Sequence, residues 1–279
     1  MERKLDVTPG VATGVTAAAQ VGDGTIVDVR RGARGLARVL SGHRPPSQRT
    51  PDWYDPGLIR ADLDPVQFAD CLATSGMRHF SLCVQGPPGT GKSAFVRHLA
   101  DRLSLEVIQK RASDLMSMWV GGTERNIAEA FAEARDAEAF LVLDEADSLL
   151  ADRRLAQRNW EVSQVNEMLT WIESHPFPVA CTTNLRERLD PATLRRFTFK
   201  LALDYLSPGQ ARAAFRIYFG TEAPAAITDL HILTPGDFSV VRRKAKILGC
   251  LGDPKAVTGM LRVECEAKQG KARRIGFHF

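Results

Sequence analysis

Short apolar runs alternate with amphipathic segments between residues 58 and 206. The apolar runs predict strands at Phe80–Gln85, Leu105–Lys110, Phe140–Leu143, Val179–Thr182 and Thr198–Leu203. Apolar residues at helical spacing predict helices at 65–74, 91–103, 124–137, 159–173 and 191–195, the third with Thr123 as its N-cap. Continuous apolar strands alternating with helices are typical of a parallel sheet that is covered on both faces. We therefore predict an α/β fold for this region.

The pattern changes on both sides of that region. Residues 207–279 predict helices at about 208–219, 236–248 and 254–268 and no strand, which indicates a small helical subdomain. In the middle helix we expect Asp237 to be the cap and the buried stripe to consist of Phe238, Val241, Ala245 and Leu248. Residues 1–57 are rich in Gly, Ala, Arg and Pro and lack sustained periodicity, so we predict a loosely ordered, basic amino-terminal arm.

The composition is that of an ordinary globular protein. Of 279 residues, 44% are apolar and 25% charged, which excludes a wholly disordered chain. No apolar run approaches the roughly 20 residues that span a bilayer, and no apolar segment follows the basic residues near the N-terminus. We therefore expect neither a membrane span nor a secretory signal. The five cysteines are odd in number, widely spaced and lack a CxxC pair, which favours reduced thiols and a cytoplasmic protein.

The charge is divided unevenly along the chain. The net charge is +4 overall, but −5 over residues 58–239 and +7 over residues 240–279. A basic carboxyl-terminal end could contact the phosphates of a nucleotide, a nucleic acid or an acidic neighbouring subunit. A solvated basic helix face explains the same charge equally well.

One glycine-rich segment carries a complete phosphate-binding motif. It satisfies GxxxxGK[ST], follows a predicted strand and opens a predicted helix, which is the context that the motif requires. Its glycines let backbone N–H groups turn inward around phosphate oxygens. We expect Lys92 to contact the β- and γ-phosphates of ATP and Ser93 to ligate Mg²⁺. The nucleotide-binding residues predicted here are Gly86, Pro87, Pro88, Gly89, Thr90, Gly91, Lys92 and Ser93.

Two carboxylates follow the apolar run Phe140–Leu143. They are Asp144 and Glu145, at the carboxyl end of a predicted strand, where open α/β sheets bind their ligands. Such a pair can also be a helix cap or a solvated turn. Beside a complete phosphate-binding loop, we expect Asp144 to hold Mg²⁺ and Glu145 to orient and deprotonate the attacking water.

Together these motifs are similar to those of AAA+ ATPases, and more narrowly of the AAA clade. The similarity runs from about Leu58 to the C-terminus. It implies a P-loop three-layer sandwich at 58–206 with a five-stranded parallel sheet of order 5-1-4-3-2, followed by a helical lid at 207–279. It also implies Mg²⁺-dependent hydrolysis of ATP to ADP and phosphate.

Three further segments resemble functional elements of that family. Asn184 matches the sensor 1 asparagine that positions water near the γ-phosphate, and Gly236 lies where the family has a glycine near the adenine. Arg195 and Arg196 match arginines that reach the nucleotide of the neighbouring subunit, which implies a homo-oligomer, most often a hexamer. The clade lacks a sensor 2 arginine, and whether Arg242 or Arg243 supplies one is open.

The segment from Ser117 to Glu124 resembles the family's first pore loop. There Trp119 and Val120 would line a central channel and grip an extended polypeptide, although a tryptophan between elements is also a common packing residue. Three functions follow: remodelling or unfolding of protein substrates, nucleic-acid-directed ATP hydrolysis, and a nucleotide-controlled assembly switch with little turnover. The resemblance favours the first, and the basic carboxyl-terminal end motivates the second.

Overall fold

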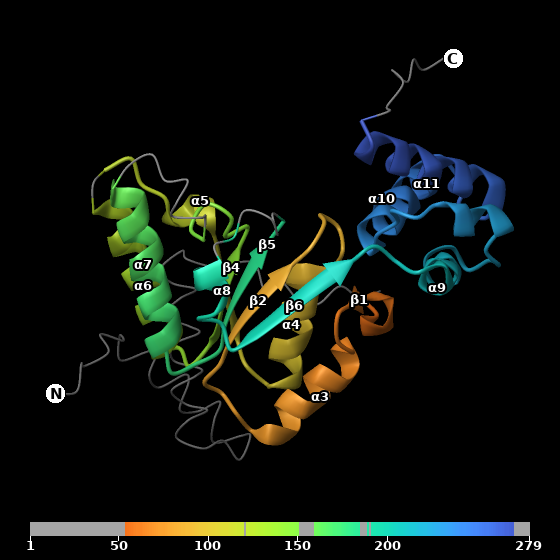
Figure 1. Cartoon of the computed structure of the whole chain (residues 1–279). Helices are drawn as coiled ribbons and strands as arrows, with labels where there is room; N and C mark the ends of the chain where they lie inside the picture. Colours follow the sequence, from red (N-terminus) through yellow and green to blue (C-terminus); the bar gives the residue numbers. More distant parts are fainter. Residues whose placement is uncertain (1–53, 120, 151–158, 185–188, 190, 271–279) are drawn as a thin grey trace, which may run out of the picture. The chain divides into compact units, whose positions relative to one another are not determined.

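One mixed sheet organises the computed structural model, which describes residues 54–119, 121–150, 159–184, 189 and 191–270 (Figure 1). Its strand order is β1-β6-β2-β5-β4-β3. The five strands from β2 to β6 pair in parallel, in the order that the family resemblance implied. They are β2 (Ser81–Gln85), β3 (Val107–Arg111), β4 (Phe140–Asp144), β5 (Val179–Thr183) and β6 (Phe199–Asp204).

The sixth strand, β1 (Arg60–Ala61), is a correction to the five-stranded prediction. It pairs antiparallel with β6, with Arg60 opposite Asp204. A strand of two residues shows no alternation of its own, so its pairing with β6 is visible only in the folded chain.

Helices cover both faces of the sheet because successive strand residues point to opposite sides. On one face, Cys83 of β2 packs in a core with α6 (Gly122–Asp136) and α7 (Asn159–Ser174). On the other, Leu82 and Val84 pack with α3 (Pro65–Ser75) and α4 (Lys92–Arg102). Every residue of β2 and β5 is buried, which explains the apolar residues at the centre of β2 and in the first half of β5. The predicted three-layer sandwich is therefore confirmed. The short helices α5 (Ala112–Leu115) and α8 (Pro191–Leu194) connect its strands.

The helical lid has a core of its own. It contains α9 (Pro208–Phe219), the 3-10 turn η4 (Ala225–Asp229), α10 (Pro235–Ile247) and α11 (Pro254–Lys268). Phe215, Phe238 and Leu261 are fully buried in this core, and Leu58 from the turn η1 (Pro56–Leu58) joins them.

Three details of the helix termini differ from the sequence prediction. Thr123 lies inside α6, whose N-cap is Gly121, and its hydroxyl accepts a hydrogen bond from the N–H of Ser117 instead. The N-cap of α10 is Thr234, and Asp237 completes a capping box with it from the third helical position. Leu248 follows the last residue of α10 and is 67% exposed, so it leaves the buried stripe.

The sequence assigned residues 54–57 to the amino-terminal arm, but they are ordered beside the lid. The carbonyl oxygen of Gly57 accepts a hydrogen bond of 3.0 Å from Gln210 of α9, and Tyr54 packs against the core that contains α4. The rest of the predicted arm, Val120 of the predicted pore loop and the carboxyl-terminal tail from residue 271 lie outside the described residues. None of the described helices combines the length and apolar character that a membrane crossing requires.

Candidate active site

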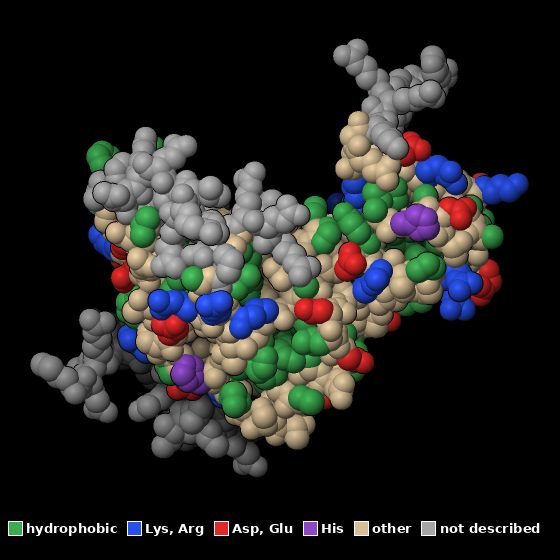
Figure 2. Space-filling model, viewed as in Figure 1, with side chains coloured by type: hydrophobic (Ala, Val, Ile, Leu, Met, Phe, Trp, Pro, Cys, Tyr) green, Lys and Arg blue, Asp and Glu red, His purple; other side chains and the backbone are tan. Residues whose placement is uncertain are grey.

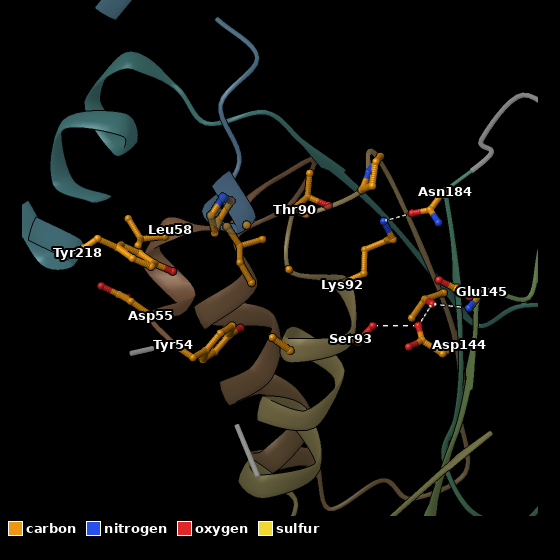
Figure 3. A pocket seen from close by; sticks show the side chains of 18 residues that line it. Tyr54, Asp55, Leu58, Thr90, Lys92, Ser93, Asp144, Glu145, Asn184 and Tyr218 are labelled. Carbon is orange, nitrogen blue, oxygen red and sulfur yellow. Dashed lines mark hydrogen bonds between the residues drawn. The ribbon is translucent and has the colours of Figure 1, made fainter. Parts of the chain in front are cut away.

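A cavity of about 340 Å³ lies at the carboxyl ends of β2, β4 and β5 and is bounded on its other side by the lid. Its volume is on the scale of small-molecule sites. Figure 3 shows Tyr54, Leu58 and Tyr218 at one end of it and Asp144, Glu145 and Asn184 at the other. The residues that line it are Tyr54, Asp55, Leu58, Ile59, Pro88, Gly89, Thr90, Gly91, Lys92, Ser93, Ala94, Asp144, Glu145, Thr182, Asn184, Tyr218, Pro235 and Gly236.

The loop between β2 and α4 is shaped for an anion. Gly91 adopts φ 95° as the N-cap of α4, a left-handed conformation that side chains resist. A Cβ on Gly86 would lie 2.4 Å from the carbonyl oxygen of Leu203 on β6, so only glycine fits there. This loop presents the unpaired N–H groups at the start of an 11-residue helix to the cavity. Its backbone can therefore bind phosphate oxygens.

The side chain of Lys92 joins this loop to the end of β5. Its Nζ donates to the carbonyl oxygens of Gly86 (2.8 Å) and Pro87 (2.9 Å) and to Oδ1 of Asn184 (2.7 Å). Burial lowers the pKa of Lys92 to about 8, against the opposing effect of nearby carboxylates, chiefly Asp144. The carbonyl groups of Gly86 and Pro87 therefore bind Lys92 without lining the cavity, whereas the other predicted loop residues line it.

Three side chains bind the carboxylate of Asp144, and a fourth acts through one of them. Ser93 Oγ donates to its Oδ1 over 2.9 Å (Figure 3), and the hydroxyl of Thr182 bonds to the same oxygen. Gln109 Nε2 donates to Oδ2 over 2.7 Å, and Arg97 holds Gln109 Oε1 over 2.8 Å. A hydroxyl beside a carboxylate is a set of hard oxygen ligands that suits Mg²⁺.

Glu145 follows in an unusual backbone conformation. Its φ is 55°, in the left-handed region that costs a non-glycine residue about 1–2 kcal/mol. Its N–H donates to the hydroxyl of Thr182 over 3.2 Å, which holds the turn, and its side chain is exposed at the cavity. Strain of this kind concentrates at functional sites. The exposed carboxylate can accept a proton from a water in the cavity.

Asn184 is held by a third acidic residue of the same turn. Oδ1 of Asp147 accepts the N–H of Asn184 over 3.1 Å and also bonds to the hydroxyl of Thr183. This contact places the amide of Asn184 at the cavity beside Lys92. Asp147 therefore orders the end of β5 without lining the cavity itself.

Gly236 closes the cavity from the lid side. Its N–H donates to the carbonyl oxygen of Gly89 over 2.9 Å, and a Cβ on it would lie 2.9 Å from the Cα of Gly89. The lid thus contacts the phosphate-binding loop through the backbone of Gly236, and the side chain of Thr234 lies beside Gly89 as well. Arg242 and Arg243, the two arginines considered for a sensor 2 role, are both exposed and do not line the cavity.

The structure does not bring the remaining predicted residues into this cavity. Arg195 is exposed, and Arg196 is exposed and pairs with Glu173 over 2.9 Å. Trp119 is 79% exposed and the adjacent Met118 is 97% exposed. These side chains are available to another molecule rather than to the cavity of their own chain.

Sequence reasoning missed several residues of the site. Gln109 and Thr182 hold Asp144, but both lie inside predicted strands, where no motif gave either side chain a role. Their only signal was a polar side chain in an apolar run. Tyr54 and Tyr218 come from the assumed arm and from the lid, and no motif marks them.

Comparison with known proteins points to one family. Residues 82–205 match the model of the ATPase family associated with various cellular activities (AAA). Pachytene checkpoint protein 2 homolog of Danio rerio is 31% identical over 197 residues, which cover 60% of this chain and 46% of that protein. Peroxisomal ATPase PEX6 of Rattus norvegicus is 34% identical over 158 residues, or 51% of this chain and 16% of that protein. Nuclear valosin-containing protein-like of Mus musculus is 31% identical over 144 residues, or 50% and 17%. The chain thus spans less than half the length of these curated relatives.

The segment that matches the family model contains the main phosphate-site residues of the cavity. Residues 82–205 contain the phosphate-binding loop with Lys92, the carboxylates of Asp144 and Glu145, and the asparagine at the end of β5. The same segment forms the parallel sheet with its 5-1-4-3-2 order. Residues 82–205 therefore form a domain of the AAA ATPase family.

Proposed function

We propose that this chain couples ATP hydrolysis to the remodelling or unfolding of protein substrates. It forms a homo-oligomeric ring, a hexamer, and grips the substrate with the loop around Trp119 and Val120. The observation that carries the proposal is the exposure of Trp119. A tryptophan that is 79% exposed contributes little to its own fold, and it offers a large, sequence-tolerant surface to a polypeptide.

The backbone of this loop supports the proposed grip. The N–H of Trp119 donates to Ser117 Oγ over 3.2 Å, and its carbonyl oxygen accepts the N–H of Gly122 over 3.0 Å. Ser117 is in turn bound to Thr123 at the start of α6. The loop is therefore tied to a core helix while its two large apolar side chains remain in solvent. A movement of α6 would be transmitted to Trp119.

The proposed roles in hydrolysis follow from the contacts in the cavity. Lys92 and the loop N–H groups hold the phosphates, and Ser93 with Asp144 hold Mg²⁺. When bound, Mg²⁺ supplies positive charge against the phosphate oxygens. Glu145 accepts the proton of the attacking water, and Asn184 orients that water. We further propose that Arg195 and Arg196 complete the site of a neighbouring subunit, since both side chains are exposed on their own chain.

Replacing Trp119 by alanine tests the substrate grip. About a fifth of this side chain is buried, so the stability lost should be about 1 kcal/mol. Basal ATPase activity should persist because the cavity is untouched, whereas stimulation by an unfolded polypeptide and substrate unfolding should be lost. Trp171→Ala is the matched control: Trp171 stacks on Phe131 with ring centroids 5.8 Å apart and packs against the core. It should cost about 3 kcal/mol without a specific loss of polypeptide stimulation. A Trp119→Ala protein that still unfolds substrate would overturn the proposal.

A second candidate is a nucleic-acid-directed ATPase. It is favoured by the exposed basic side chains of α10, which are Arg242, Arg243, Lys244 and Lys246. Acidic side chains lie among the basic ones on the lid (Figure 2), and Lys244 already pairs with Glu264 over 2.5 Å. Stimulation of ATP hydrolysis by DNA rather than by unfolded polypeptide would favour this candidate. The slope of nucleic-acid affinity against salt concentration would give the number of phosphate contacts.

A further inference from the structure

The last residue of α11 contacts the lid segment that faces the nucleotide site. Lys268 Nζ donates to Asp237 Oδ2 over 2.6 Å and to the carbonyl oxygen of Ile232 over 3.1 Å, and it lies 3.4 Å from Thr234 Oγ1. It also lies 5.7 Å from the ring centroid of Tyr205, in the connection from β6 to α9. One ammonium group thus touches the connection into the lid, the approach to α10 and the first turn of α10.

Its partner Asp237 is a buried carboxylate whose Oδ2 accepts three hydrogen bonds. Its side chain is 8% exposed, against 25% for Lys268. The same Oδ2 accepts the N–H of Thr234 over 2.7 Å and the hydroxyl of Thr234 over 2.9 Å. Asp237 is therefore more than a helix cap: it joins α11 to the segment Thr234–Gly236, and its charge is compensated by Lys268.

That segment is the part of the lid that contacts the phosphate-binding loop. Gly236 donates its N–H to Gly89, and the hydroxyl of Thr234 would lie 2.7 Å from a Cβ on Gly89. The segment is tied at its other side as well, because the N–H of Leu206 donates to the carbonyl oxygen of Leu233 over 2.8 Å. A continuous series of contacts therefore runs from Lys268 through Asp237 and Thr234–Gly236 to Gly89.

We propose that Lys268 and Asp237 form a lid latch, in which Lys268 is a positioning residue for nucleotide binding. The latch holds Thr234–Gly236 against Gly89 and so keeps the lid side of the cavity formed before ATP enters. Lys268 does not line the cavity, and it acts only through Asp237 and Gly236. The inference rests on ATP binding by this chain and is independent of the proposed protein remodelling.

The expected effect is on affinity rather than on the chemical step. Apparent affinity falls in proportion to the fraction of molecules whose site is already formed. Without Lys268, Asp237 would retain a buried charge with only the donors of Thr234, so the segment would rearrange toward water and leave Gly89. We expect the Kd for ATP to rise about tenfold, which corresponds to about 1.4 kcal/mol. Turnover at saturating ATP should stay within about twofold, since bound ATP restores the closed segment.

The test compares Lys268→Met, Asp237→Asn and the double variant in the full chain. The Kd for ATP is measured by calorimetry, and folding is checked by thermal melting. The value of kcat is measured at saturating ATP. Each single variant should bind ATP about tenfold more weakly, and the double variant should be no worse than the weaker single one because both changes open one latch. Lys268→Arg should restore most of the affinity. Lys255→Met, an exposed residue of the same helix, is the control and should bind as the parent chain does.

Several outcomes would overturn the latch. They are an unchanged Kd in a folded Lys268→Met protein, independent and additive effects of the two single variants, or a Lys268→Arg protein as weak as Lys268→Met. A fall in kcat with unchanged Kd would equally exclude a positioning role before binding. If Lys268→Met does not fold, Lys268→Gln, which keeps a hydrogen-bond donor without the charge, provides the same comparison with Lys268→Arg.

Discussion

Gly236→Ala offers a sharp test of how the lid meets the phosphate-binding loop. Gly236 does not use a left-handed φ, so alanine is compatible with its backbone, and the effect of the substitution is steric. The new Cβ would lie 2.9 Å from Gly89 Cα and 3.1 Å from Gly89 O. Both atoms are backbone, so no side-chain rotation relieves the contact.

The size of the effect can be worked from these distances. Carbon atoms pack at about 3.5–4.0 Å, so the segment must retreat by about 0.6 Å or more. The hydrogen bond from Gly236 to Gly89, now 2.9 Å, would then stretch to about 3.5 Å and be lost. A lost hydrogen bond costs about 1 kcal/mol, and forced repacking about 1 kcal/mol more. We expect about 2 kcal/mol against the closed lid segment, or about a 30-fold rise in the Kd for ATP.

Calorimetric titration with ATP measures this effect, and Gly259→Ala is the matched control. Gly259 lies inside α11 with open space around its Cα, so alanine there should leave ATP affinity unchanged and stabilise the chain by about 0.5–1 kcal/mol. Unchanged ATP affinity in Gly236→Ala would refute the reasoning, because the clash with Gly89 would then be relieved without opening the cavity.

Further predictions concern the charged groups of the site. Lys92→Ala should abolish tight ATP binding in calorimetry. In the parent chain, Lys92 has a lowered pKa of about 8 and loses its charge as pH rises through that value, so the Kd for ATP should rise toward tenfold per pH unit above it. Glu145→Gln should still bind ATP while steady-state turnover falls about 10²-fold or more, and unchanged turnover would exclude Glu145 as the base. Arg195→Ala and Arg196→Ala should lower turnover far more than binding. Mixing either with Glu145→Gln should restore some hydrolysis if the arginines act on a neighbour, whereas co-assembly without recovery would contradict that arrangement.

The sequence determined the elements and the motif residues of this protein because their signals are local. The spacing of apolar residues placed the strands and the main helices, and the glycine-rich loop identified Lys92 and Ser93 without reference to distant residues. The pair Asp144–Glu145 was found because it directly follows an apolar run. The sheet order came from the family resemblance, since spacing alone does not decide which strands pair.

Only the tertiary structure decided which side chains complete the site. Gln109 and Thr182 hold Asp144 from two other strands, and Lys268 reaches Asp237 from a helix that begins 17 residues beyond it. These contacts depend on the pairing of strands and on helix packing, which bring together residues far apart in the chain. Leu248 illustrates the same point: its spacing fits the buried stripe, but the end of α10 leaves it in solvent. Local patterns in the sequence determine which helix, strand or motif a residue belongs to, and long-range packing determines which residues it contacts.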